Sequence, residues 1–334
     1  MTRSCFAVRS LVAGACTVLL VNACTDSGSV TAPSSDAAPP SASHVQELNT
    51  RHLFHTRQFY AKSNSAKPSS STGILYHGGP LIVNPAVTKV VAIYWGTGTI
   101  YSGQKLGTGA GSTDATLIGS FLRNLGGSPY FNINTSYYNG AGAHVLNAVT
   151  YTSYWGTGTD VAGPSSSPTD ADMVNLISSG ISKGKIAYDA NTVYAIFTGS
   201  HVNLGGGFGS QYCAYHTHGT TSAGKVVLYA AMPHNQDYPS GCTSALASPN
   251  ADVAANSEVN TLAHEIEEST TDELGTAWYD RRGYENADKC AWTWGTTHTA
   301  SNGGVYNMQL KDGNFYLIQR NWVNSGSGGC ASSF

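Results

Sequence analysis

The sequence predicts a mixed α/β or α+β domain, in which helices pack against a mixed β-sheet. Continuous, largely apolar runs are typical of strands that are buried on both faces. Three such runs lie at 89–95, 192–198 and 225–231. Helical patterns lie between them, and the turn Lys311-Asp-Gly-Asn314 joins two late strand patterns as a hairpin. Helices that interleave with strands, followed by a closing hairpin, indicate this mixed architecture.

Capping residues and periodicity place the other elements. Thr113 or Asp114 is the expected N-cap of a helix that Gly126-Gly127 ends. Pro168-Thr-Asp170 begins a second helix with apolar residues along one side. Stretches rich in Tyr and Thr favour strands. In chain order, these further elements are helix 113–124, strands 131–138 and 145–154, helices 168–181 and 256–270, and strands 305–310 and 315–319.

The N-terminal residues predict export. Arg3 and Arg9 precede the apolar stretch Leu11 to Val21, which is too short to span a bilayer, so residues 1–23 are expected to be a signal peptide. The sequence Val21-Asn-Ala-Cys24 resembles a bacterial lipobox and predicts lipidation of Cys24. We therefore expect a lipid anchor in the membrane of the cell envelope, with an ordinary signal peptide and a secreted protein as the alternative.

Composition divides the remaining chain. Residues 24–72 are rich in Ser, Pro and Ala and predict a disordered tether, within which 44–61 is compatible with a short polar helix. Residues 73–334 are long enough to form a single globular domain. The net charge of −3, without any basic block, argues against a nucleic-acid partner.

Four cysteines lie in the expected domain: Cys213, Cys242, Cys290 and Cys330. An even number of cysteines in an exported chain predicts two disulfide bonds. We favour the pairs Cys213–Cys242 and Cys290–Cys330, because each pair brackets one local unit. Metal binding by these cysteines is disfavoured, since none of them forms a close Cys-x-x-Cys pair.

The helix at 256–270 carries the candidate chemistry. His264-Glu265-x-x-Glu268 is a variant of the zinc-protease motif in which the second histidine is a glutamate. Because residues i and i+4 share one face, His264 and Glu268 can bind one metal ion, and Glu265 can act on a water molecule as a general base. Glutamate occurs seven times in the chain, and six of the seven lie between 258 and 285. The sequence therefore predicts a zincin-like active-site helix. The alternative is an exposed acidic helix, since charged runs are usually solvated.

A catalytic zinc ion takes three protein ligands and needs one from outside this helix. Glu285, beyond a break at Gly275, is the first choice, because Glu285-x-x-Asp288 resembles the third-ligand region of thermolysin-like zinc proteases. Asp272 is the alternative, although on a continuous helix it would lie about 12 Å from His264. Asp288 is expected to support the second ring nitrogen of His264. Two carboxylates and one imidazole favour harder ions than the two-histidine motif does, so zinc is expected and structural calcium is the alternative.

The roles of other histidines and tyrosines are less well defined by the sequence. His216 and His218 would face one surface of a strand, and we interpret them as structural residues beside Cys213, with a second metal site as the alternative. No nucleophile elbow, meaning a Gly-x-Ser-x-Gly turn between a strand and a helix, is predicted, which argues against an esterase triad. The donor to a developing oxyanion is left open among Tyr279, Tyr284, His298 and His216.

Several short stretches together resemble the EXORDIUM-like, or phosphate-induced, family. They are Tyr76-His-Gly-Gly-Pro80, Ala263-His-Glu265, Thr271-Asp272, Trp278-Tyr279 and Glu285-x-x-Asp288-x-Cys290. The resemblance covers 73–330, and the lipoprotein leader and the stretch 316–322 set this chain apart as a bacterial branch. It implies a secreted protein, since plant members are associated with the cell wall, and it implies no particular enzymatic activity.

Two functions follow as hypotheses. The first is an exported, metal-dependent hydrolase, a zinc peptidase acting on a peptide or cell-wall substrate, in which His264, Glu268 and Glu285 bind the metal and Glu265 is the base. The second is a non-catalytic EXORDIUM-like cell-surface protein. Its acidic helix would be structural or stabilised by a metal, and exposed Tyr and Trp side chains would bind wall carbohydrate or a protein partner.

Overall fold

The structure is a computed structural model that describes residues 51–65, 73–96, 109–111 and 114–334. The predicted signal peptide and Cys24 lie outside the described residues, as does most of the predicted tether. Within the described ranges, no helix combines the length and the apolar character needed to cross a membrane.

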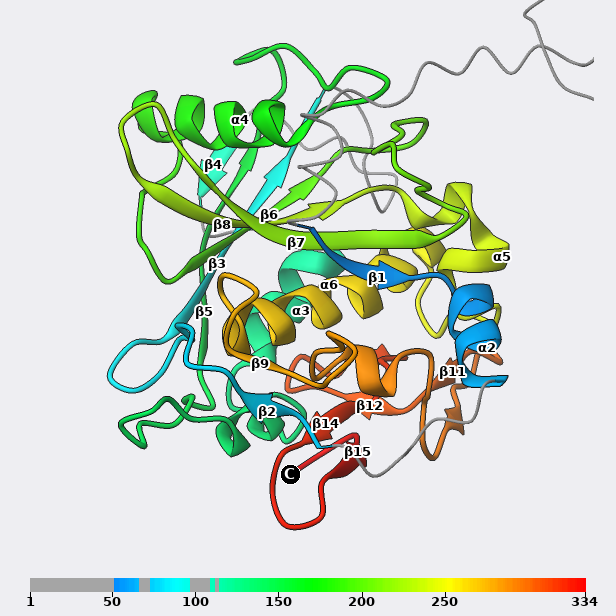
Figure 1. The fold of residues 1–334 in the computed structure, drawn as a ribbon. Coiled ribbons are helices and arrows are strands. Elements are labelled where there is room, and N and C mark those ends of the chain that lie inside the picture. The colour runs from blue at the N-terminus through cyan, green and yellow to red at the C-terminus, as the bar shows by residue number, and fades with distance from the viewer. Residues whose placement is uncertain (1–50, 66–72, 97–108, 112–113) are drawn as a thin grey trace, which may run out of the picture. The chain divides into compact units, whose positions relative to one another are not determined.

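A mixed sheet of seven strands forms the centre of the fold (Figure 1). Its middle is parallel and consists of β8 (Val226–Met232), β6 (Thr192–Phe197), β3 (Thr88–Tyr94) and β5 (Val149–Gly156). Antiparallel strands complete the sheet: β7 (Tyr212–Thr220) beside β8, β1 (His52–His55) at the edge beyond β7, and β4 (Gly109–Gly111) at the other edge. The predicted mixed sheet with packed helices is confirmed.

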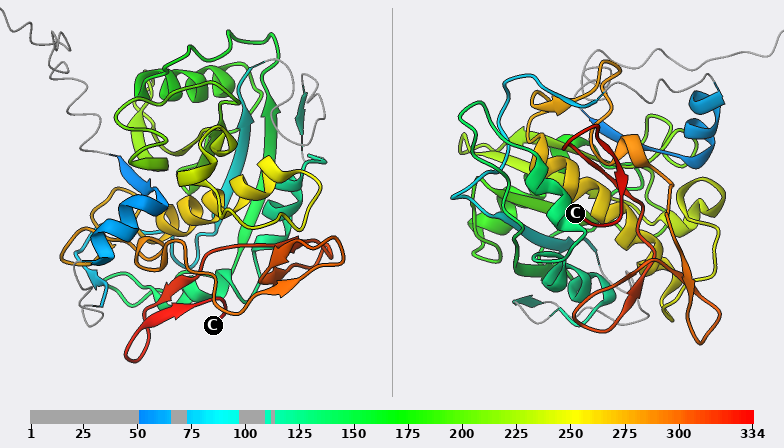
Figure 2. Two further views of the ribbon diagram at one scale, coloured as in Figure 1. Left: turned by 90° about the vertical axis from the view of Figure 1, so that its right-hand side faces the viewer. Right: turned by 90° about the horizontal axis from the view of Figure 1, so that it is seen from below.

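Helices cover both faces of this sheet. α3 (Leu117–Leu125) and α6 (Val253–Thr271) lie on one face, and α4 (Asp170–Ser182) lies on the other (Figures 1 and 2). Alternate side chains of β3 therefore belong to two different hydrophobic cores, one on each face of the sheet. Val90 and Ala92 pack with α3 and α6, whereas Val91 and Ile93 pack with α4. This burial on both faces explains why the central strands are continuous apolar runs.

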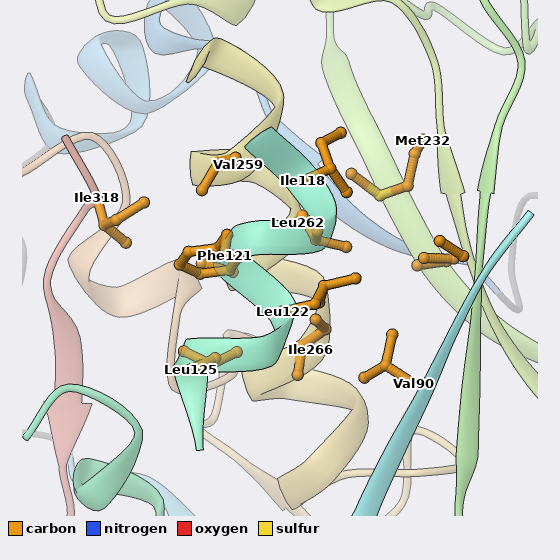
Figure 3. Close-up of a cluster of buried hydrophobic side chains, with 14 of the residues drawn as sticks. Val90, Ile118, Phe121, Leu122, Leu125, Met232, Val259, Leu262, Ile266 and Ile318 are labelled. Atoms are coloured by element: carbon orange, nitrogen blue, oxygen red, sulfur yellow. The ribbon is translucent and has the colours of Figure 1, made fainter. Parts of the chain in front are cut away.

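The candidate helix α6 buries one side in the first of these cores. Val259, Leu262 and Ile266 lie against α3, where Figure 3 shows them beside Phe121 and Leu122. The helix begins at its N-cap Asp252, whose carboxylate accepts a hydrogen bond from the Ala255 amide at 2.9 Å. The apolar side predicted from Leu262 and Ile266 is thereby confirmed, and the side with His264 and Glu268 turns toward other elements.

Shorter elements surround this framework. They are α2 (Arg57–Ser65), the β2–β9 pair (Leu75–Tyr76, Trp278–Tyr279), η1 (Phe131–Ser136), η2 (Asn235–Asp237), α5 (Pro239–Cys242), η3 (Asp288–Cys290) and the pairs β10–β11 (His298–Thr299, Val305–Tyr306), β12–β13 (Met308–Gln309, Phe315–Tyr316) and β14–β15 (Asn321–Val323, Gly329–Ala331). The hairpin predicted around Lys311-Asp-Gly-Asn314 is β12–β13. It is shorter than expected, because Val305 and Tyr306 pair with β10 instead.

Both preferred disulfide bonds are present. Cys213 of β7 is bonded to Cys242 of α5, and Cys290 of η3 is bonded to Cys330 of β15. The first fastens the α5 turn to the sheet, and the second fastens the loop after α6 to the C-terminal hairpin. Each bond therefore joins a short element to a neighbouring part of the domain.

The assignment of residues up to 72 to a tether is wrong for residues 51–65. β1 pairs with β7 as a strand of the main sheet, and α2 follows it. Phe54 is fully buried and Tyr60 nearly so, in a cluster with Cys213 and Cys242. The interpretation as a tether overlooked these aromatic residues, whose burial offsets the conformational entropy lost on ordering the segment.

Two predicted elements also differ. Most of the strand predicted at 131–138 is instead the 3₁₀ helix η1 (Phe131–Ser136), since the Thr135 and Ser136 hydroxyls donate to the carbonyls of Asn132 and Ile133, three residues back. The predicted helix at 113–124 begins later, because Thr116 is its N-cap and accepts from the Gly119 amide at 3.0 Å. In both cases, hydrogen bonds between side chains and nearby backbone groups determine the local backbone conformation.

The carboxylate of Asp312 joins the β12–β13 hairpin to α3. It accepts hydrogen bonds from the Ser120 hydroxyl at 2.6 Å, the Tyr316 hydroxyl at 2.7 Å and the Asn314 amide group at 2.8 Å. Burial alone would raise the pKa of Asp312, but these donors outweigh it and hold the pKa below its ordinary value of 3.8. The carboxylate therefore contributes stability above pH 3.8, and this contribution is lost as the pH falls through the lowered pKa.

We expect Asp312→Asn to lower the free energy of unfolding by about 1–2 kcal/mol at pH 7, through loss of charge-assisted hydrogen bonds. The difference between the two proteins should shrink below about pH 4, where protonation removes the same interactions. Urea unfolding of both proteins at pH 7 and pH 3 checks this. An equal deficit at both pH values would contradict the lowered pKa.

Candidate metal centre

His264 and Glu268 meet on the buried polar side of α6. His264 Nε2 lies 3.0 Å from Glu268 Oε1, and both side chains are at most 1% exposed. The i, i+4 spacing of the helix sets this approach. Glu268 Oε1 also accepts a hydrogen bond from the Asp288 amide at 3.0 Å, so the start of η3 is held against the helix.

Asp288 completes a first set of three donors. Its Oδ1 lies 3.7 Å from His264 Nε2, and the donor atoms of His264, Glu268 and Asp288 all lie within 4.8 Å of one another. Its position is fixed further by the Tyr60 hydroxyl of α2, which donates to Oδ1, and by the Glu285 amide, which donates to Oδ2 at 3.3 Å. Three close donors of this kind can hold a metal ion.

His216 of β7 brings the sheet into the cluster. Its Nε2 lies 3.4 Å from Glu268 Oε2 and 3.2 Å from Glu285 Oε2. His52 of β1 reaches the same Glu285 oxygen through Nδ1 at 2.8 Å, and its ring stacks on His216 with centroids 4.8 Å apart. Two further sets of donors result, His216–Glu265–Glu268 and His52–His216–Glu285. Glu268 therefore belongs to two of the three sets in the described part of the chain.

The predicted third ligands lie in different places. Glu285 groups with the two histidines of the sheet rather than with His264. Asp272 is the C-cap of α6, and its Oδ1 accepts from the amides of Thr276 at 2.5 Å and Ala277 at 2.7 Å, so that oxygen stabilises the turn. The ligand set expected from the sequence, His264, Glu268 and Glu285, stays a prediction.

The second ring nitrogen of His264 meets Gln319 rather than Asp288. Gln319 Nε2 lies 3.0 Å from His264 Nδ1 and donates to the Ala287 carbonyl at 2.9 Å. Sequence reasoning missed Gln319, Tyr60 and His52, and it assigned His216 a structural role. The alternating His216-x-His218 pattern was the available signal for His216, since it placed both side chains on one face of a strand.

Burial and crowding separate the acids into two kinds. Burial, together with the neighbouring acids, raises the pKa of the Glu265 carboxyl, and burial and Glu268 raise the pKa of Asp288. Burial would also raise the pKa of Glu268 and Glu285, but adjacent histidines outweigh it and lower both. Burial would lower the pKa of His216, and Glu285 and Glu268 reverse this and raise it. Such opposed shifts within one cluster are typical of functional sites.

Several buried polar atoms in the cluster have no hydrogen-bond partner. Both carboxyl oxygens of Glu265 are of this kind, as is Glu285 Oε1. Burying a polar group without a partner is unfavourable, and burying several together is more so. The donor chemistry, imidazole and carboxylate, fits zinc. A depression of about 260 Å³ opens onto Glu285 and Asp288 between β1 and the loop 282–285.

The conserved region of phosphate-induced protein 1 matches residues 74–331 of this sequence. The chain belongs to the phosphate-induced protein 1 family. The match covers the whole of α6 and the loop with Glu285 and Asp288, and it begins after β1 and α2. No curated protein and no solved structure matches the chain significantly. The family membership confirms the resemblance found in the sequence and leaves the chemistry to be argued from the site.

Proposed function

We propose that this member of the phosphate-induced protein 1 family is an exported zinc-dependent hydrolase that cleaves peptides. The observation that carries the proposal is the Glu265 carboxyl, which is fully buried, without a hydrogen-bond partner, and beside His216 and Glu268. An acid in this position is unfavourable for folding alone, so its presence favours a role in chemistry. Export rests on the predicted signal peptide and on Cys24 as a lipid anchor in bacteria.

His264, Glu268 and Asp288 would hold the zinc ion, because they form a compact set of three donors. Glu285 approaches the same His216 nitrogen, Nε2, as Glu268 does, and would support the site through that histidine. Binding through His264 Nε2 requires the proton on Nδ1, so the Gln319 amide would have to present its oxygen to the ring. Calcium is the weaker candidate, since His264 is a poor ligand for a hard ion.

A bound zinc ion would supply Lewis acidity toward the scissile carbonyl and would lower the pKa of a water molecule. Glu265 would take the proton from the attacking water and deliver it to the leaving amine. Glu285 and Glu268 raise the pKa of His216, which favours its charged form, and in that form His216 would be the best placed donor to a developing oxyanion. We therefore prefer His216 to Tyr279, Tyr284 and His298, the other oxyanion donors that the sequence left open.

Metal content of the purified protein tests the site. We expect about one zinc ion per chain, and its loss in His264→Ala and Glu268→Ala, because each removes one of three ligands. His298→Ala is the matched control, since His298 is exposed on β10. Elemental analysis after dialysis against a weak chelator gives the stoichiometry. Retention of zinc in both ligand variants, or its loss in the control, would rule out this ligand set.

A second candidate function follows from the burial of the cluster. Glu268 and Glu285 are 1% exposed and Asp288 is 8% exposed, as in a structural metal site. In that case the protein is a non-catalytic surface protein that binds wall carbohydrate or a protein partner. Metal removal would then unfold it, whereas removal of a catalytic zinc ion would leave a folded, inactive protein. Thermal unfolding with and without a chelator separates the two.

A further inference from the structure

A short segment ahead of the family region lies directly on the candidate metal centre. β1 and α2 together span residues 52–65, and the family match begins at residue 74. The stretch that joins α2 to the family region, Ala66-Lys-Pro-Ser-Ser-Ser-Thr72, contains no large apolar residue. The segment is therefore held in place by its own contacts with the domain, and these contacts converge on the centre.

The main chain of β1 occupies the edge of β7. The two strands are antiparallel, with His52 opposite His216 and Phe54 opposite Ala214. Main-chain hydrogen bonds along a sheet edge are independent of sequence, so any extended polypeptide can form them in place of β1. Because His216 belongs to β7, a chain at this edge passes next to the candidate ligands.

The side chains of the segment cover the candidate ligands one by one. His52 Nδ1 lies 2.8 Å from Glu285 Oε2, and the Tyr60 hydroxyl donates to Asp288. Phe54 fills a slot between two rings, with its centroid 4.1 Å from that of His264 and 4.7 Å from that of Trp292. His52 and Phe54 alternate along β1, and thus point to the same side.

We propose that the edge of β7 is a groove for an extended polypeptide with a large apolar side chain, and that residues 51–65 are its built-in occupant. The slot between His264 and Trp292 selects the apolar side chain. While β1 and α2 stay in place, they cover His264 and restrict access to the centre to the depression beside Glu285 and Asp288. The inference rests on the proposed function for the reaction that is blocked, whereas the groove itself can be tested without any reaction.

The test uses the full chain with a specific protease recognition sequence in place of residues 66–72. The protein is cut there, and a fluorescent peptide with the sequence of residues 50–65 is added before and after cutting. We expect saturable binding only after cutting, by exchange with the segment. A matched peptide with Phe54→Ala should bind about tenfold to a hundredfold more weakly, because it leaves the apolar slot empty. Hydrolysis of a peptide library should rise at least tenfold on cutting.

The outcomes separate the groove from the reaction. Exchange of the peptide without any hydrolysis supports the groove and removes the proposed peptidase function. Hydrolysis at the same rate before and after cutting, with no exchange, overturns the inference and leaves the peptidase function standing. Unfolding of the cut protein when the segment leaves also overturns it, since β1 and α2 would then be integral to the domain.

Discussion

Replacing Glu265 by glutamine is expected to abolish hydrolysis and to leave zinc binding intact. Glutamine has the shape of glutamate but cannot accept a proton at neutral pH, so the general base is lost. General base catalysis contributes about 10²–10⁴-fold to rate, and we expect a loss in kcat of this size. Folding should not suffer, because neither oxygen of Glu265 has a hydrogen-bond partner to lose. Steady-state kinetics and metal content on the same preparation measure both effects.

This variant also distinguishes the overlapping sets of donors. If zinc is held by His264, Glu268 and Asp288, Glu265→Gln keeps the metal. If zinc is held by His216, Glu265 and Glu268, the same variant loses it, and Asp288→Asn keeps it instead. Glu273→Gln, just beyond the end of α6, is the matched control and should behave as the unchanged protein. Full activity of Glu265→Gln would exclude Glu265 as the base.

The local part of the site could be predicted from sequence because helix geometry fixes it. The spacing of His264 and Glu268 is enough to bring their side chains together, and Leu262 and Ile266 identify the buried side of the same helix. The central strands were also predictable, since strands with helices on both faces are apolar at every position. These inferences depend only on neighbours along the chain.

The rest of the site depends on the order of the strands in the sheet. His216 reaches Glu268 because β7 lies beside β8 in reverse direction and passes over α6, and no local pattern specifies that order. His52 was missed because residues 51–65 were assigned to the tether, although Phe54 and Tyr60 pack this segment against the domain. Whether Asp288 or Glu285 lies nearer to His264 depends on the η3 turn and the Cys290–Cys330 bond.

Glu267 is the residue of α6 whose loss should cost the most stability. It is fully buried, and its Oε2 accepts hydrogen bonds from the side-chain amides of Asn134 in η1 and, at 2.8 Å, Asn321 in β14. Burial raises the pKa of Glu267 well above its ordinary value, which favours the neutral form of this carboxyl group. Glu267 acts as a hydrogen-bond acceptor that joins three elements.

We expect Glu267→Ala to lower the free energy of unfolding by about 3–5 kcal/mol, since it leaves two buried amide donors unpaired and opens a cavity. Glu267→Gln keeps an oxygen acceptor of the same reach and, because burial already favours the neutral form of Glu267, should cost about 1 kcal/mol or less. Urea unfolding of the two variants at pH 7 measures the difference. A large loss in Glu267→Gln as well would show that the carboxylate charge is needed. It would place Glu267 in the electrostatic balance of the metal centre, next to Glu268, instead of in the scaffold that positions it.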